Sequence, residues 1–220
     1  MSWSSGKDSA WALYQLLHNP EFEVVGLFCT INKKFNRVAM HSVRVALLKQ
    51  QAAQIGLPLH IIELPFPCSN VDYEAIMGDF VAQVQRDEID CFAFGDLFLE
   101  DIRQYREDKL QGTGIEPIFP IWGMPTDELS YQMIDVGLKA ITTCVDPKQA
   151  PEHLIGQIFD KQFLQSLPDG VDPCGENGEF HSFVFDAPMF KQPIDITVGE
   201  IVHRDGFIFA DVLPTAATTQ

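Results

Sequence analysis

Short apolar runs alternate with amphipathic helical stretches through the first half of the chain, and this alternation restricts the fold more than any other feature. Consecutive apolar residues indicate buried strands, whereas apolar residues that recur every three or four positions indicate helices. Strands separated by helices form a parallel sheet, because a parallel pair needs a long crossover connection. We therefore predict an α/β fold over residues 1–111, with a parallel sheet flanked by helices. The expected strands are 24–30, 59–64 and 91–94, and the expected helices are 10–17, 41–55 and 70–86, the last with Asn70 as its N-cap.

The residue pattern of the chain changes beyond about residue 112, where prolines become frequent. Here we expect a helix that begins near Thr126, a strand at 140–145, a helix at 151–164 and a turn-rich segment at 168–179. Alternating runs at 180–185, 194–202 and 207–212 are typical of antiparallel strands. The sequence thus predicts a second, smaller α+β region over residues 112–220, with the active site between the two regions and a disordered tail at 214–220.

The composition is that of a globular protein with a strongly negative charge. Hydrophobic residues make up 46% of the chain, and no apolar run approaches the roughly 18 residues of a membrane helix. The five cysteines form no C-x-x-C pair, so we expect reduced thiols and, because no secretory leader is recognised, a cytoplasmic protein. The net charge of −16 disfavours nucleic-acid substrates, although the local group of Lys33, Lys34, Arg37 and Arg44 could hold phosphate.

The segment Ser4-Ser5-Gly6-Lys7-Asp8-Ser9 stands directly before the first predicted helix. At such a position, backbone N–H groups, hydroxyls and a lysine can converge on one anion, which the helix dipole also favours. The segment is not a Walker A motif, because that motif needs a glycine five residues before Gly6 and position 1 is Met. It predicts a phosphate-binding loop, and the alternative is a Ser-rich turn in which Asp8 caps the helix.

This segment resembles the S-G-G-K-D-S loop of the PP-loop ATP pyrophosphatases. The resemblance implies a Rossmann-like sheet and a loop, Ser4 to Ser9, that grips the β,γ-pyrophosphate of ATP while the α-phosphate is attacked. Ser5 replaces the usual glycine, which suits the loop only if this position does not need a positive φ. Only Met1 to Trp3 precede the loop, so either the strand expected there is truncated or the true N-terminus lies upstream.

Further segments, in the same order along the chain, make the sequence similar to the diphthine-ammonia ligase-like family within this superfamily. They are Met40 to Arg44, Phe94 to Asp96 followed by 101–106, Pro120 to Trp122, and Cys174 to His181. The resemblance implies an enzyme that uses ATP and Mg²⁺, forms AMP and pyrophosphate, and joins ammonia or an amine to a carboxylate such as diphthine.

The segment that follows the third strand carries candidate ligand-binding residues. Gly95 and Asp96 lie where open α/β sheets place their ligands, and Asp96, together with Asp8 of the loop, is a candidate ligand of Mg²⁺. A helix cap is the alternative role for Asp96. Arg103 and Arg106 are three residues apart, so both could clamp one phosphate or carboxylate, or they could pair with the acidic residues around them.

A glycine-containing turn near the end of the chain carries Glu176, Glu179 and His181. We predict that these three, with Lys7, are the catalytic residues, because histidine and carboxylates are the usual bases that orient an amine and take its proton. A metal site with Cys174 and a purely structural hairpin are the alternatives. His41 is expected to open the second helix and to approach the nucleotide.

The leading functional hypothesis is a ligase that adenylates a small-molecule or protein carboxylate and transfers ammonia. A second hypothesis is an enzyme that modifies a tRNA base, which the low basicity and the missing cysteine pair disfavour. A third is a non-catalytic module that binds adenine nucleotides. We expect no membrane partner and leave the oligomeric state open, with a homodimer as one option.

Overall fold

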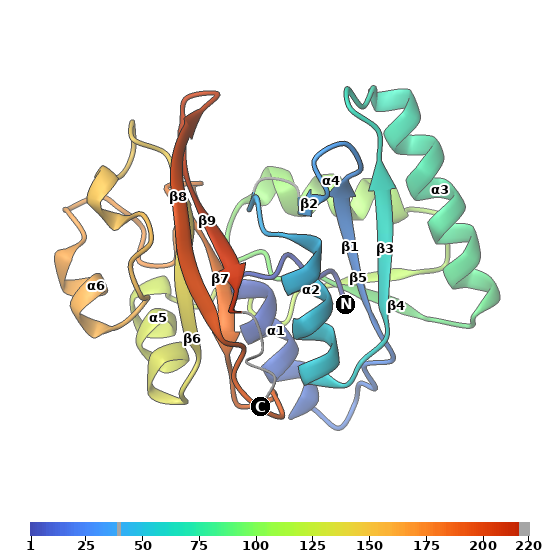
Figure 1. Cartoon of the computed structure of the whole chain (residues 1–220). Coiled ribbons are helices and arrows are strands. Elements are labelled where there is room, and N and C mark those ends of the chain that lie inside the picture. Colours follow the sequence, from blue (N-terminus) through green and yellow to red (C-terminus); the bar gives the residue numbers. More distant parts are fainter. Residues whose placement is uncertain (39–40, 216–220) are drawn as a thin grey trace, which may run out of the picture.

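The computed structural model describes residues 1–38 and 41–215. In the first half, a parallel pair and an antiparallel pair share strand β1, so that the sheet order is β2-β1-β3, and a second parallel pair joins β4 to β5. The elements are α1 (Lys7–Leu17), β1 (Leu27–Asn32), β2 (Arg37–Val38), α2 (Val45–Ile55), β3 (Leu59–Leu64), α3 (Asn70–Arg86), β4 (Cys91–Ala93), α4 (Glu100–Leu110) and β5 (Glu116–Ile118). The predicted parallel sheet with flanking helices is confirmed (Figure 1).

The first three residues connect these two pairs of strands. Ser2 forms a parallel bridge with Phe28 of β1, and its N–H donates to Ala93 O of β4 at 2.8 Å. Trp3 N–H donates to Phe28 O, also at 2.8 Å. Residues 1–3 therefore take the central position of the sheet, between β1 and β4, and lead directly into the loop at Ser4.

The second half of the chain forms an antiparallel sheet in the order β7-β6-β9-β8. Figure 1 shows the short helices of this half on one side of the sheet and α1 and α2 on the other. The elements are α5 (Thr126–Asp135), β6 (Lys139–Val145), the 3₁₀ helix η1 (Glu152–Leu154), α6 (Lys161–Ser166), β7 (Phe180–Asp186), β8 (Ile196–Arg204) and β9 (Phe207–Pro214). The predicted antiparallel strands are confirmed, and the sheet includes β6 as well.

Some predicted boundaries in the first half are wrong. Strand β1 begins at Leu27 instead of residue 24. Helix α2 begins at Val45 instead of residue 41, because Ser42 has a left-handed backbone, with φ of +56°, that cannot continue into a helix. Helix α3 has the predicted span, but its N-cap is Ser69 instead of Asn70. The Met40 position of the predicted motif lies outside the described residues.

The helix predicted at 151–164 does not form. One 3₁₀ turn is followed by Gly156, whose φ of +71° ends it, and Ile158 then pairs with Ile141 of β6 as an isolated bridge. A new helix, α6, starts after Asp160, whose carboxylate accepts from the Phe163 N–H at 2.8 Å. Sheet pairing thus overrides the helical spacing. The tail predicted as disordered starts inside β9, and its residues 216–220 lie outside the described residues.

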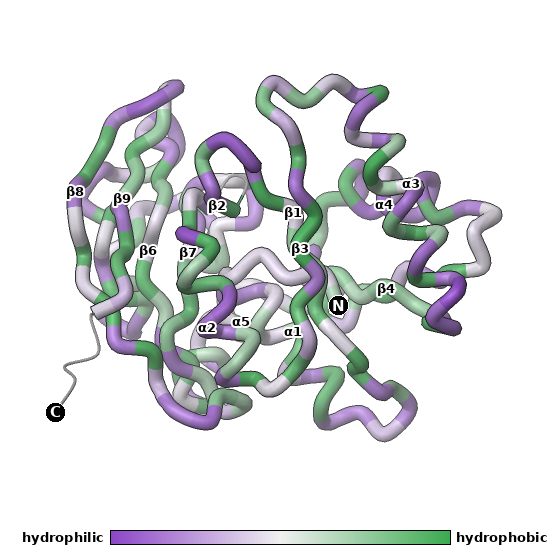
Figure 2. Tube along the Cα trace, turned by 45° about the vertical axis from the view of Figure 1, so that its right-hand side comes forward, coloured by the Kyte–Doolittle hydropathy of each residue, from purple (hydrophilic) through white to green (hydrophobic). Residues whose placement is uncertain are grey.

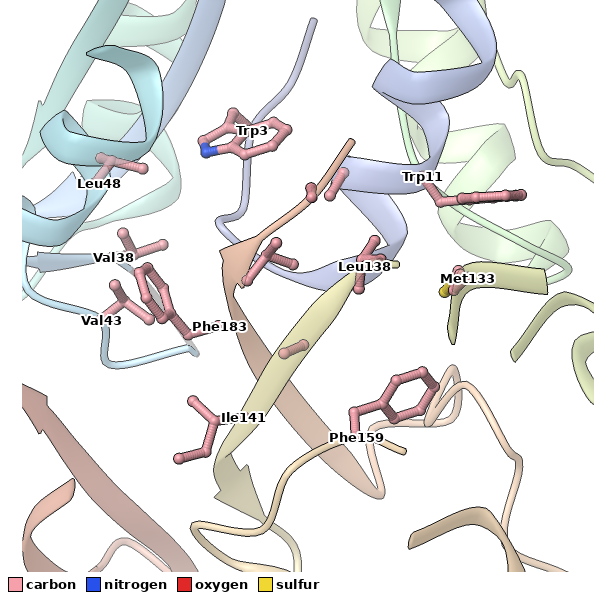
Figure 3. Close-up of a cluster of buried hydrophobic side chains, with 14 of the residues drawn as sticks. Trp3, Trp11, Val38, Val43, Leu48, Met133, Leu138, Ile141, Phe159 and Phe183 are labelled. Atoms are coloured by element: carbon pink, nitrogen blue, oxygen red, sulfur yellow. The ribbon is translucent and has the colours of Figure 1, made fainter. Parts of the chain in front are cut away.

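One hydrophobic core extends through both halves of the molecule. Trp3 and Leu48 from the first half and Ile141 and Phe183 from the second belong to the same cluster of buried side chains (Figure 3). In Figure 2 the apolar colour follows the interior strands, whereas the polar colour concentrates on outer turns and helix faces. This shared core takes residues from both sides of the predicted boundary at residue 111, and it holds the start of the chain against the antiparallel sheet.

Five cysteines are unpaired in the structure: Cys29, Cys68, Cys91, Cys144 and Cys174. Among residues 1–38 and 41–215, no helix is both long and apolar enough to cross a membrane.

Candidate functional site

The loop Ser4–Ser9 lies where residues 1–3 leave the sheet and α1 begins. Its backbone is held from two sides: Ser5 O accepts from Gln51 Nε2 of α2 and from Val184 N–H of β7, both at 3.0 Å. Lys7 N–H, at the start of α1, donates to Ser182 Oγ at 3.2 Å. The loop is therefore fixed by the second helix and by the antiparallel sheet, so its shape depends on both halves of the molecule.

Ser5 has a positive φ. Its φ is +72°, in the left-handed region that favours glycine, and its side chain is fully buried. Within the described part of the chain, the buried Ser5 Oγ has no hydrogen-bond partner. The condition under which a serine would suit this position is therefore not met, and Ser5 is a strained substitute for the glycine of the loop that this segment resembles.

Lys7 and Asp8 form an ion pair beneath this loop. Lys7 Nζ lies 2.9 Å from each carboxylate oxygen of Asp8, donates to Cys174 O, and sits over the rings of Phe159 and Phe180. Burial lowers the pKa of the lysine, but the neighbouring carboxylates outweigh this effect, so its pKa is raised. Lys7 is 1% exposed, so its ammonium is a charged group that is buried where the two halves of the molecule meet.

Gly95 allows strand β4 to reach the first turn of α1. A Cβ at this position would lie 2.9 Å from the Asp8 carbonyl carbon and 2.9 Å from Ser9 N, too close for any other residue. The following residue, Asp96, is partly buried and accepts from Arg106 Nε at 3.3 Å. Gly95 and Asp96 thus lie beside the loop, as predicted, and a close backbone contact explains the glycine.

The turn that carries Glu176 meets this same place from the other half of the chain. Glu176 Oε1 accepts from Leu97 N–H at 2.7 Å, and Glu176 N–H donates to Asp172 Oδ2 at 2.8 Å. Burial is the main cause that raises the pKa of Glu176 to about 7, and the charges of Asp8 and Asp96 raise it further. A carboxylate with this pKa can take and release a proton near neutral pH.

Glu179 lies inside the turn instead of at its surface. The side chain is 3% exposed, and its Oε1 accepts from Asp172 N–H at 3.0 Å and from Asn177 Nδ2 at 2.9 Å. Its other oxygen has no partner among the residues that the structure describes. These contacts hold the turn in shape, so the catalytic role predicted for Glu179 stays a prediction.

His41 and His181 lie together over the loop. Their ring centroids are 4.6 Å apart, His41 Nδ1 is 3.4 Å from Ser182 O, and a Cβ on Gly6 would lie 3.0 Å from His41 Cε1. Burial is the main cause that lowers the pKa of His41 to about 3 and that of His181 to about 4. Both rings are neutral at pH 7. His41 approaches the loop as predicted, but from the segment before α2 instead of from the helix itself.

The two arginines of α4 are oriented differently. Arg106 reaches Asp96 and its guanidinium lies over Phe94, 4.7 Å from the ring centroid. Arg103 pairs with Glu107 at 2.8 Å and lies over the rings of Phe119 and Trp122. Arg106 is therefore next to the predicted site, while the recorded contacts of Arg103 are made within α4 and with the segment after β5.

Sequence reasoning missed residues that hold the loop from a distance, above all Gln51 and Ser182. Gln51 lies in the run of α2 between buried apolar residues and is 0% exposed, and a glutamine on the apolar side of a predicted helix was a usable signal. Ser182 alternates with apolar residues along β7, and nothing in its local sequence marks it. Its role depends only on the packing of β7 against α1.

Carboxylates near the loop are the candidate ligands for a metal ion. Across the described ranges, 1–38 and 41–215, no group of three or more His, Cys, Asp or Glu side chains is arranged to hold a metal. The metal site considered with Cys174 therefore gains no support. Asp8 and Asp96 are both partly accessible and both act on Glu176, which fits the mode in which Mg²⁺ takes one or two carboxylates and completes its shell with phosphate and water.

Three features together are those of a PP-loop type of nucleotide-binding protein. They are a parallel sheet, a loop with hydroxyls and a lysine at the start of the first helix, and an acidic turn that leads into an antiparallel sheet. The chain belongs to the diphthamide synthase family. The model of the diphthamide synthase N-terminal domain matches residues 1–116, and that of the diphthamide synthase C-terminal domain matches residues 125–212.

Individual relatives are similar at low identity. The diphthine–ammonia ligase of Bos taurus is 26% identical over 133 residues, which are 58% of this chain and 50% of the bovine protein. That of Mus musculus is 26% identical over 180 residues, 80% of this chain and 67% of the mouse protein. That of Schizosaccharomyces pombe is 29% identical over 105 residues, 46% of this chain and 17% of the yeast protein. The alignment with the bovine protein thus spans about half of its length.

Proposed function

We propose that this chain is an ATP-dependent carbon–nitrogen ligase that adenylates a carboxylate, releases pyrophosphate and transfers ammonia to the activated acyl group. The observation that carries the proposal is the meeting of the nucleotide loop with the acidic turn. Lys7 of the loop donates to Cys174 O of the turn, and Glu176 of the turn accepts from Leu97 N–H, directly after Asp96. Membership of the diphthamide synthase family and the similarity to diphthine–ammonia ligases support the same reaction class.

In the first step a carboxylate oxygen of the substrate attacks the α-phosphorus of ATP. The bond from that phosphorus to the bridging oxygen breaks, and pyrophosphate leaves with the electron pair. The helix start at Ser4–Ser9 supplies the positive end of a dipole and hydroxyl donors for the departing anion. Lys7 is protonated, so a turn of its side chain from Asp8 towards the pyrophosphate would deliver a positive charge there.

In the second step ammonia attacks the acyl carbon, AMP leaves, and one proton is released. Ammonium, the dominant form at neutral pH, must first lose a proton to become a nucleophile. Glu176 is the group suited to accept it, because its pKa is raised to about 7, whereas the pKa of His181 is lowered to about 4. We therefore assign the general base to Glu176 and a packing role over the loop to His181.

Asp8 and Asp96 are the residues that would hold Mg²⁺, which neutralises phosphate charge when bound. Arg106, paired with Asp96, lies close enough to hold the AMP phosphate or the substrate carboxylate. We propose a diphthine-like acid as the substrate, because the similar bovine and mouse proteins are diphthine–ammonia ligases. A cytoplasmic location and a homodimer remain predictions.

The first test is product analysis with Mg-ATP, candidate acids and ammonium. We expect AMP and pyrophosphate from the unchanged protein and at least a hundredfold slower formation from Lys7→Met, which keeps the apolar stem between Phe159 and Phe180 but removes the charge. The matched control is Lys109→Met, because Lys109 is an exposed lysine that also pairs with a carboxylate, that of Glu74.

Other products would contradict the proposal. ADP and phosphate would exclude attack at the α-phosphorus. Tight binding of ATP without cleavage under any acid would favour the non-catalytic nucleotide-binding module, and turnover that depends on added tRNA would favour modification of a tRNA base.

A further inference from the structure

A carboxylate far from the loop in sequence holds the segment that carries His41. Asp211, on strand β9 of the antiparallel sheet, accepts from Arg37 Nη1 at 2.9 Å, from Arg44 Nε at 3.0 Å and from Arg44 Nη2 at 2.6 Å. These bonds join residues that are 174 and 167 positions apart. Side-chain hydrogen bonds, first from Arg44 and then from Arg37, lower the pKa of Asp211, so the carboxylate is ionised throughout the neutral range.

The two arginines flank the His41 segment and fix its ends against each other. Arg37 and Arg44 form an isolated antiparallel bridge, and Val38 N–H donates to Val43 O at 2.9 Å. Arg37 Nη1 also donates to Ser42 O at 2.7 Å. Without the Asp211 carboxylate, two adjacent guanidinium groups would repel each other across this bridge.

This conformation of the segment is energetically costly. Ser42 has a φ of +56°, a left-handed geometry that costs a non-glycine residue about 1–2 kcal/mol. His41 directly precedes Ser42, and its ring lies against Gly6 of the loop and against His181. A restraint from outside the segment would offset this cost, and the contacts of Asp211 with Arg37 and Arg44 are placed to provide it.

We propose that Asp211 is a positioning residue: through Arg37 and Arg44 it places His41 on the phosphate-binding loop and thereby sets the affinity for ATP. The part of this inference that concerns ATP rests on the proposed function, whereas the position of His41 does not. The last strand of the antiparallel sheet thus acts on the nucleotide loop at the start of the chain without touching it. Nothing in the local sequence around Asp211 indicates such a role.

The test is Asp211→Asn, compared with Asp135→Asn as a matched control. Asp135 pairs with Lys161 at 2.6 Å on an exposed surface, so the control loses the same charge and one ion pair elsewhere. The first readout is the pH titration of the His41 Cε1 proton by NMR in the protein without nucleotide, with the resonance assigned from His41→Gln. The second is the dissociation constant for ATP.

We expect His41 in the unchanged protein and in the control to remain neutral down to pH 5, because burial lowers its pKa and the titratable groups that face it, His181 and Lys7, disfavour its charge. In Asp211→Asn the ring should be released to solvent and titrate close to the ordinary value of about 6.5. The dissociation constant for ATP should rise about tenfold, a change of 1.4 kcal/mol.

An unchanged His41 titration together with unchanged ATP affinity in folded Asp211→Asn would overturn the inference. If that variant does not fold, Arg44→Gln provides the same test, because the Arg44 side chain is 41% exposed and its loss removes the bonds from one partner only. If no form of the protein binds ATP, the proposed function fails, and the His41 titration still decides whether Asp211 positions the ring.

Discussion

The loop at the start of the chain and the acidic turn near its end each place a carboxylate in the same cluster. The two carboxylates, Asp8 and Glu176, differ in the charged groups that surround them. Asp8 in the loop has the Lys7 ammonium at 2.9 Å from both of its oxygens. Glu176 in the turn has one recorded donor to its side chain, the Leu97 N–H at 2.7 Å, and lies close to Asp8 and Asp96. Asp8 is therefore paired directly with a cation, whereas Glu176 is influenced both by the Lys7 ammonium, which lowers its pKa, and by the charges of Asp8 and Asp96, which raise it.

This difference teaches which carboxylate is suited to move protons. Burial raises the pKa of both carboxylates, but at Asp8 the Lys7 ammonium and its hydrogen bonds act directly against this rise. The pKa of Glu176 is raised to about 7, mainly by burial and further by the charges of Asp8 and Asp96. Glu176 in the turn is therefore the carboxylate better suited to take and release a proton near neutral pH.

The largest expected effect tests whether Glu176 is the carboxylate that accepts the proton. Glu176→Gln keeps the shape and the hydrogen bond to Leu97 but cannot accept a proton, so ligation should slow by about 10²–10⁴-fold. In the unchanged protein the ligation rate should fall as the pH decreases through about 7, and the variant should lose this dependence. Steady-state rates between pH 5.5 and 8.5 would measure both, and a variant that keeps the rate and the pH dependence would contradict the assignment.

Stability supplies a second readout for the same residue, independent of any substrate. The pKa of Glu176 is raised from 4.5 to about 7 in the folded protein, so its contribution to stability is fully present below pH 4.5 and is lost as the pH rises through 7. Glu176→Gln should therefore be more stable than the unchanged protein at pH 8, by about 1 kcal/mol after allowance for solvent screening, and show no such gain at pH 4.5. Urea unfolding at the two pH values would check the sign.

The next largest effect is expected from a substitution that disrupts the contact between the loop Ser4–Ser9 and the segment that precedes Asp96. Gly95→Ala would bring a Cβ to 2.9 Å from the backbone of Asp8 and Ser9, so we expect a loss of about 1–3 kcal/mol of stability and a weaker affinity for ATP. Gly78→Ala is the control, because Gly78 lies inside α3 with nothing within 4 Å of its Cβ position and should gain up to about 1 kcal/mol. Equal effects of the two substitutions, by urea unfolding, would show that the contact is unimportant.

The smallest expected effect comes from relieving the strained backbone of the loop at Ser5. Ser5→Gly relieves a φ of +72° and removes a buried hydroxyl that has no partner within the described residues, and both changes stabilise the fold. Against the extra freedom that glycine gives the unfolded chain, we expect a net gain of up to about 1 kcal/mol in the free energy of unfolding, with ATP affinity retained. A loss of stability would mean that the hydroxyl makes a contact that outweighs the strain.

Much of the local structure follows from local pattern. The apolar spacing of α3 and the short run of β3 predict their spans without error, because both depend on one face or one run that must be buried. Prediction failed where a long-range contact competes with local preference. The segment 151–164 has helical spacing, yet Ile158 pairs with β6, and before Val45 Ser42 has a left-handed backbone beside Arg44, which pairs with Asp211 of the distant strand β9.

The sequence by itself determined that a loop rich in hydroxyls and carrying a lysine stands before a helix and that an acidic turn follows far along the chain, because residue type and spacing are local properties. Only the tertiary structure decided what those residues do. It gave Ser5 a backbone conformation that favours glycine, buried the two histidines, paired Asp8 with Lys7 and placed Glu176 near Asp8 and Asp96. Burial and the charge of spatial neighbours set the protonation of a side chain, and both depend on contacts between residues that are far apart in the chain.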